Sequence, residues 1–164
     1  STDAKALDQQ TGMEVTISLM TALIHGANIV HDVGFMDAGL QGSLQLQVIA
    51  NETIGFLRAA TRGVVVDDET LALDAINEVG PSGSFLQHPH TLRHYKEPFY
   101  SKLFDKGPYS MWEKNGRLTL EDKAAREVDR ILETHTAQPL PEEVRETIAS
   151  IVRREQAWIE NQQD

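Results

Sequence analysis

Hydrophobic residues in the first sixty positions recur at helical spacing in two separate segments. The first pattern predicts a helix over about residues 8–25, which Gly26 would end. The second predicts a helix over about residues 43–62. The side chains expected on the buried faces are Met13, Ile17, Met20 and Ile24 in the first helix, and Leu46, Ile49, Thr53 and Leu57 in the second.

The segment between these helices has the pattern of one short strand followed by a loop. Asn28 to His31 form the predicted strand, and Gly34, Gly39 and Gly42 would let the following loop approach a ligand closely. A strand between two helices is the unit of a parallel α/β sheet. Because the rest of the sequence holds no second convincing strand, the chain is either a piece of a larger α/β domain or a helical protein with one unusual strand.

Beyond Gly63 the sequence predicts a mainly helical extension. Helices are expected over about residues 68–79, capped by Asp67, over 119–135, where Thr119 to Asp122 resemble a capping box, and over 142–159. Residues 64–66 are interpreted as an extended connection, with a strand as the alternative. The apolar faces of the last two helices would be Leu120, Ala124, Val128 and Ile131, and Val144, Ile148, Ile151 and Trp158.

Composition narrows the class of protein. The formal net charge of −10 argues against nucleic-acid binding, which needs a basic surface. No apolar run approaches the roughly 18 residues that span a bilayer, so no membrane association is expected. The absence of cysteine excludes a thiol nucleophile and fits a reducing compartment, and we therefore expect a cytoplasmic protein.

The end of the predicted strand is the first candidate site. Ligands of α/β proteins bind beyond the carboxyl ends of strands, where this chain places His31, Asp32, Phe35, Met36 and Asp37. His31 could serve as a general base, a polar contact or a conformational anchor. The alternatives are a buried histidine that backbone groups satisfy, and an aspartate that caps the next helix.

A second cluster consists of His88, His90 and His94. Three imidazoles within seven residues suggest zinc, but their spacing matches neither common zinc motif that we compared, and the next acid is Glu97. We therefore predict local packing or an interface rather than a metal site. The acidic run Asp67 to Glu69 is interpreted as helix-start acids on a solvated surface.

Several blocks of residues, in order over nearly the whole chain, together resemble the trimethylamine methyltransferase family, which includes glycine-betaine-type members without pyrrolysine. They are Thr2-Asp3-Ala4-Lys5 followed by Asp8-Gln9-Gln10, Gly26-Ala27-Asn28, Asp67-Asp68-Glu69-Thr70-Leu71-Ala72-Leu73-Asp74, Glu78-Val79-Gly80-Pro81-Ser82-Gly83, Phe85-Leu86 and His88-Pro89-His90-Thr91-Leu92. The resemblance implies the carboxyl-terminal third of such a protein.

This resemblance implies a fold. Residues 1–63 would be the end of a (β/α)8 TIM barrel and hold its last βα unit, and residues 64–164 a carboxyl-terminal helical extension. Asn28 to His31 would be the eighth strand, and Ser1 to Asp3 the mouth-side end of the seventh. As an isolated chain the protein would be mainly α.

The resemblance also implies a function, in which a methyl group moves from a tertiary or quaternary amine to the cobalt of a partner corrinoid protein. His31 would be catalytic, and Asp3, Phe35 and Asp37 would bind the ammonium group. No cofactor would be bound directly, because the partner carries the cobalamin. The position that matches the pyrrolysine of some members lies at or before the start of this chain, and the loop from Phe35 to Asp37 differs in detail from the family, so the substrate stays open.

Two further expectations follow from the barrel interpretation. The chain alone should be inactive, because a barrel builds its site from the loops of many strands. It should also form a homo-oligomer that buries the apolar face at Ile17, Met20 and Ile24 against Leu46, Ile49 and Leu57 of its own or another chain. The alternative function is a non-catalytic helical interaction module.

Overall fold

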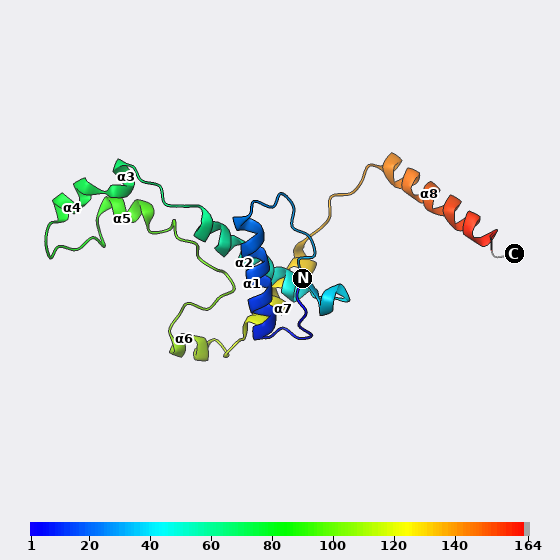
Figure 1. Ribbon diagram of the computed structural model, residues 1–164, viewed down its shortest axis with the longest axis horizontal. Helices are drawn as coiled ribbons and strands as arrows, with labels where there is room; N and C mark the ends of the chain where they lie inside the picture. Colours follow the sequence, from blue (N-terminus) through cyan, green and yellow to red (C-terminus); the bar gives the residue numbers. More distant parts are fainter. Residues whose placement is uncertain (163–164) are drawn as a thin grey trace. The chain divides into compact units, whose positions relative to one another are not determined.

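The structure, a computed structural model that describes residues 1–162, is mainly helical (Figure 1). It has two compact units, residues 1–131 and the residues from 132 onward. The elements in chain order are α1 (Gln9–Ile24), β1 (Phe35–Met36), the 3₁₀ helix η1 (Asp37–Gly39), β2 (Gln41–Gly42), α2 (Leu44–Thr61), α3 (Asp68–Leu71), α4 (Leu73–Val79), α5 (Pro89–His94), α6 (Tyr109–Lys114), α7 (Leu120–Thr134) and α8 (Glu142–Glu160).

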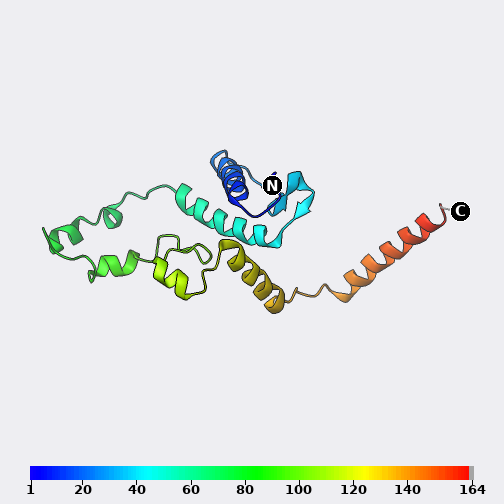
Figure 2. The same cartoon turned by 90° about the horizontal axis from the view of Figure 1, so that it is seen from below.

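The core of the first unit lies between α1 and α2, which pack against each other in both views (Figures 1 and 2). Its buried members are Val15, Leu19, Met36, Leu46, Ala50 and Leu57. The helix starts are fixed locally, because Asp8 accepts hydrogen bonds from the backbone N–H groups of Gln10 and Thr11, and Ser43 accepts one from Leu46. The two predicted helices are therefore confirmed to within about one residue at each end.

Within this chain, the predicted buried face of α1 does not pack against α2. Met13, Ile17, Met20 and Ile24 are 45–65% exposed, whereas Thr11, Val15 and Leu19 are buried against α2. The helix α1 carries apolar side chains on most of its sides, so their spacing alone does not determine which face packs against another helix. On α2 the prediction is largely confirmed, since Leu46, Thr53 and Leu57 are buried.

The predicted strand from Asn28 to His31 does not form in this chain. These residues belong to no helix or strand, and Ile29 is 84% exposed. A parallel strand is stable only where neighbouring strands pair with its N–H and C=O groups, and the described residues supply no such neighbour. The β structure of residues 1–162 is one antiparallel pair, Phe35 with Gly42 and Met36 with Gln41.

The helical extension follows the prediction with one break. The helix expected over residues 68–79 is divided at Ala72, whose φ of 52° is left-handed, into α3 and α4. Asp67 caps α3 in a reciprocal pair with Thr70, and Thr119 and Asp122 hydrogen-bond in the same way at the start of α7. Residues 64–66 form no strand, which confirms the extended connection. The predicted boundary between residues 63 and 64 stays a prediction.

In the second unit, α8 begins and ends within one residue of the predicted helix, and none of its described side chains is buried. Its apolar positions Val144, Ile148, Ile151 and Trp158 are exposed. Within residues 1–162, no helix is both long enough and apolar enough to cross a membrane.

Candidate functional site

The predicted substrate-binding residues come from two backbone segments that lie side by side. The Thr2 N–H donates to the Phe35 carbonyl at 3.1 Å, and the Asp37 N–H donates to the Ala4 carbonyl at 3.1 Å. Asp3 lies between Thr2 and Ala4, the two residues of its segment that make these hydrogen bonds. The structure thus brings the segments of Asp3, Phe35 and Asp37 together although the sequence separates them by more than thirty positions.

This pair of segments offers groups that attract a cation. The Phe35 ring is half exposed, and an aromatic face and carboxylates both stabilise a positively charged ammonium group. Asp37 already attracts one cation within the chain, since Lys5 Nζ lies 3.1 Å from Asp37 Oδ1. Asp37 has a left-handed φ of 50°, a conformation that aspartate tolerates better than most residues and that often marks functional loops.

Glu14 of α1 holds the amino-terminal segment in place, a role that no local pattern in the sequence indicates. Its Oε2 accepts hydrogen bonds from the Thr2 hydroxyl at 2.6 Å and from the Asp3 N–H at 2.8 Å. The hydrogen bond from Thr2, followed by those from Gln10 and Asp3, lowers the pKa of Glu14 below its ordinary value. A charged Glu14 therefore stabilises the position of Asp3.

The predicted catalytic residue, His31, is exposed in this chain. Its Nδ1 lies 2.8 Å from Asp32 Oδ2, and 84% of its side chain is accessible. Within residues 1–162, no hydrogen bond or ion pair joins His31 to Asp3, Phe35 or Asp37, but the Phe35 N–H donates to the Asp32 carbonyl at 3.3 Å. The alternative of a buried histidine satisfied by the backbone does not describe His31 here.

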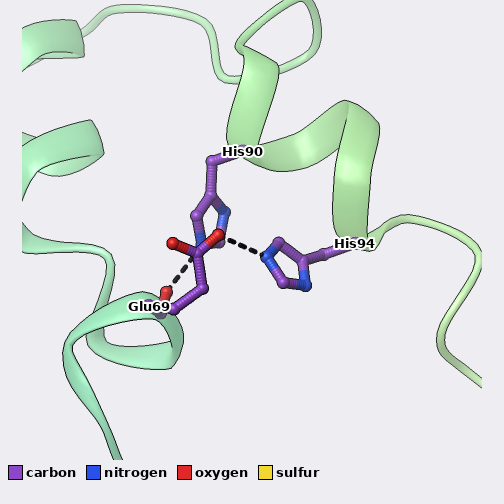
Figure 3. Close-up of side chains that lie close together, drawn as sticks. All are labelled: Glu69, His90 and His94. Carbon is purple, nitrogen blue, oxygen red and sulfur yellow. Dashed lines mark hydrogen bonds and ion pairs between the residues drawn. The ribbon is translucent and has the colours of Figure 1, made fainter.

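Two of the three clustered histidines contact Glu69, an acid that the sequence pattern predicts on a solvated surface. His90 and His94 are four residues apart on α5 and point toward Glu69 of α3 (Figure 3). His94 Nε2 lies 2.9 Å from Glu69 Oε1, and His90 Nε2 lies 2.8 Å from the Glu69 carbonyl and 3.9 Å from Oε1. Nothing in the local pattern could have revealed this contact, because Glu69 is 21 to 25 residues away along the chain.

Hydrogen bonds within this cluster shift the pKa values of Glu69 and His94. Hydrogen bonds from His94 and then Arg93 lower the pKa of Glu69 to about 2. Glu69 and then Glu97, whose Oε1 lies 2.5 Å from His94 Nδ1, raise the pKa of His94. Both partners are partly exposed, so solvent weakens these interactions.

His88 lies apart from this cluster and has a different role. Its Nδ1 accepts a hydrogen bond from the His90 N–H at 3.2 Å, which caps α5, and its Nε2 lies 3.3 Å from Glu78 Oε2. An acceptor Nδ1 assigns the proton to Nε2, so both ring nitrogens are engaged. The predicted use of His88, His90 and His94 in an interface stays a prediction.

The first unit also has an open hollow of about 140 Å³ between α1, α2 and the residues near Phe104 and Leu120. Its lining is mainly apolar, with Val15, Leu46 and Ile49 among its members. It holds none of the predicted site residues, so this hollow belongs to the packing of the helices rather than to the candidate chemistry.

Comparison with known proteins identifies the class. The family model described as trimethylamine methyltransferase (MTTB) matches residues 1–159. The chain is 33% identical over 150 residues to trimethylamine methyltransferase MttB of Desulfitobacterium hafniense, a match that covers 92% of the chain and 30% of that protein. It is 29% identical to the protein of the same name from Methanosarcina barkeri (strain Fusaro / DSM 804), with coverage of 92% and 30%.

A third relative is named for a different substrate. The chain is 31% identical over 144 residues to the glycine betaine methyltransferase of Desulfitobacterium hafniense (strain Y51), with coverage of 87% of the chain and 30% of that protein. The chain belongs to the trimethylamine methyltransferase family, which confirms the resemblance, and it spans about 30% of the length of these curated relatives.

Proposed function

We propose that this chain is the carboxyl-terminal third of an enzyme that moves a methyl group from a tertiary or quaternary amine to the cobalt of a partner corrinoid protein. The observation that carries the proposal is the family match over residues 1–159, together with relatives that are named for trimethylamine and for glycine betaine. No observation favours the alternative, a non-catalytic helical interaction module, over this function.

The barrel interpretation also accounts for the exposed segment from Asn28 to His31. Ile29 and Val30 are apolar and exposed, as expected of an eighth barrel strand whose neighbouring strands lie outside this chain. The two hydrogen bonds that join residues 2–4 to residues 35–37 support the interpretation that these segments are neighbours at the barrel mouth. In the complete protein, residues 1–63 would close the barrel and the later helices would form the extension.

The amine site is assigned to the loops that follow the barrel strands. Phe35 would hold the ammonium group against its ring, and Asp3 and Asp37 would supply negative charge. Asp37 would exchange its ion pair with Lys5 for the substrate cation. These groups orient the amine so that one N-methyl carbon faces the partner, which is the positioning contribution to catalysis.

The corrinoid of the partner protein would supply the nucleophile, its reduced cobalt, and this chain would bind no cobalamin directly. As the N–CH₃ bond breaks, its electron pair stays on nitrogen. A quaternary ammonium then leaves as a neutral tertiary amine, and a tertiary amine, which must react in its protonated form, leaves as a neutral secondary amine. His31 is the proposed catalytic residue beside this reaction, and Asp32 would fix the orientation of its ring through the 2.8 Å contact.

Methyl transfer to the cobalt can be followed by the absorbance of the corrinoid protein. We expect transfer when the complete protein is mixed with the reduced corrinoid protein and either trimethylamine or glycine betaine, and none with the 164-residue chain alone. Turnover by the chain alone would contradict the barrel interpretation. Failure of the complete protein with tertiary and quaternary amines alike would contradict the function.

A further inference from the structure

We propose that Glu69, His90 and His94 form a zinc-binding site that joins α3 to α5. Two imidazoles and one carboxylate are a ligand set that zinc enzymes and other zinc proteins use. One ligand atom from each of these three residues lies within 4.8 Å of the other two (Figure 3). This inference does not depend on the proposed methyl transfer.

The distances in the cluster fit a zinc ion after small side-chain rotations. Zinc binds nitrogen and oxygen at about 2.0–2.1 Å in a tetrahedron, so its ligand atoms lie about 3.3 Å apart. From Glu69 Oε1 the distances to His94 Nε2 and His90 Nε2 are 2.9 Å and 3.9 Å, one below and one above that value. On binding zinc, His90 Nε2 would exchange its hydrogen bond with the Glu69 carbonyl for a bond to the metal.

The surroundings of the three residues are those of a metal site. A ligand histidine normally has a carboxylate or carbonyl on its other ring nitrogen, and Glu97 Oε1 lies 2.5 Å from His94 Nδ1. The Arg93 Nη2 group donates to the Glu69 carboxylate at 2.8 Å, so the proposed carboxylate ligand is also held in place. His88 caps α5 and fixes the first turn, which carries His90.

The local packing gives an independent reason for a metal. Among residues 64–97, Ala75 alone is buried, and α3 and α5 have four and six residues. Helices this short are unstable by themselves, because helix formation in water becomes favourable only beyond about 12–15 residues. Segments without a hydrophobic core are commonly held by a metal ion, whose binding energy then adds to the folding energy.

Zinc binding can be measured on the full-length protein after a chelator has removed its metals. We expect one equivalent of Zn²⁺ to bind per chain, with tight binding lost in His90→Ala and in His94→Ala. The matched control is His135→Ala, which removes an exposed histidine outside the cluster and should bind zinc as the parent does. Glu97→Gln should weaken zinc binding about 10–100-fold, because it changes only the group that orients His94.

A measurement on the unaltered protein keeps the test independent of how the variants fold. Cobalt(II) in place of zinc should give the absorption of a four-coordinate site, and X-ray absorption at the zinc edge should show two imidazole ligands. Zinc binding that is equal in the parent protein and in folded His94→Ala overturns the proposal. So does zinc with no imidazole ligand, or a protein that binds no zinc.

Discussion

At the scale of single residues, the side chains proposed for function are exposed, and a different set of side chains holds the backbone in place. His31 and Phe35 are accessible and contribute little to the packing of this chain. Glu14 and Thr2, in contrast, hold the segment that carries Asp3. Substitutions at the first group should therefore change rates, and substitutions at the second should change the position of a site residue.

His31→Ala in the complete enzyme separates these two effects. We expect methyl transfer to fall about 10²–10⁴-fold, the usual contribution of a positioned acid or base, while Tm stays within a few degrees. The physical reason is that the imidazole is exposed and contacts only Asp32 among the described interactions of this chain. The two measurements are the single-turnover rate with the corrinoid protein and thermal unfolding. A destabilised but fully active variant would assign His31 a structural role.

Glu14 should make the position of the amino-terminal segment depend on pH. Its pKa is lowered in the folded protein, so its hydrogen bonds stabilise the fold above the ordinary glutamate pKa and are lost as pH falls through the lowered value. The amide signals of Thr2 and Asp3, followed by NMR, should shift in that acidic range. In Glu14→Gln, which can still accept hydrogen bonds but does not titrate, these shifts should be clearly smaller. Identical titrations in both proteins would contradict the role of Glu14.

At the scale of elements, the sequence predicts best what is decided locally. The caps at Asp8, Ser43 and Asp67 set helix starts through hydrogen bonds within the next three residues, so they can be identified from the sequence alone. The buried face of α1 and the contact of Glu69 with α5 depend on distant segments, and neither was predicted. Residues 28–31 have the composition of a strand, but a strand forms only where neighbouring strands pair with it, and one segment of sequence does not show whether such neighbours exist.

A substitution at Gly34 tests how the loop between α1 and α2 is held against α2. Its φ is +95°, and a Cβ there would lie 3.1 Å from Gln47 Cβ and 3.3 Å from the Ser43 carbonyl. Gly39→Ala is the matched control, because its φ is +92° but nothing lies within 4 Å of the added carbon. Backbone strain should cost each variant about 1–2 kcal/mol. Urea unfolding should show a larger loss for Gly34→Ala, and equal losses would mean that the contact with α2 contributes nothing.

At the scale of the whole molecule, the proposed barrel would account for the large apolar surface of this chain. The chain spans about 30% of its relatives, and the face of α1 at Ile17, Met20 and Ile24 is exposed along with Ile29. In a complete barrel protein such surface would be covered by other helices and strands. The partners first expected for it, Leu46 and Leu57, are instead buried by the opposite side of α1.

The 164-residue chain without the barrel should therefore form a homo-oligomer through the exposed face of α1, since contiguous apolar surface drives association. Sedimentation should show a dimer or larger species that Ile17→Glu shifts toward monomer, because association would then bury an unpaired carboxylate. Ser18→Glu adds the same charge at the neighbouring exposed position and should leave the oligomer largely intact. If the unaltered chain sediments as a monomer, or if both variants dissociate it equally, this face of α1 is not the surface that associates.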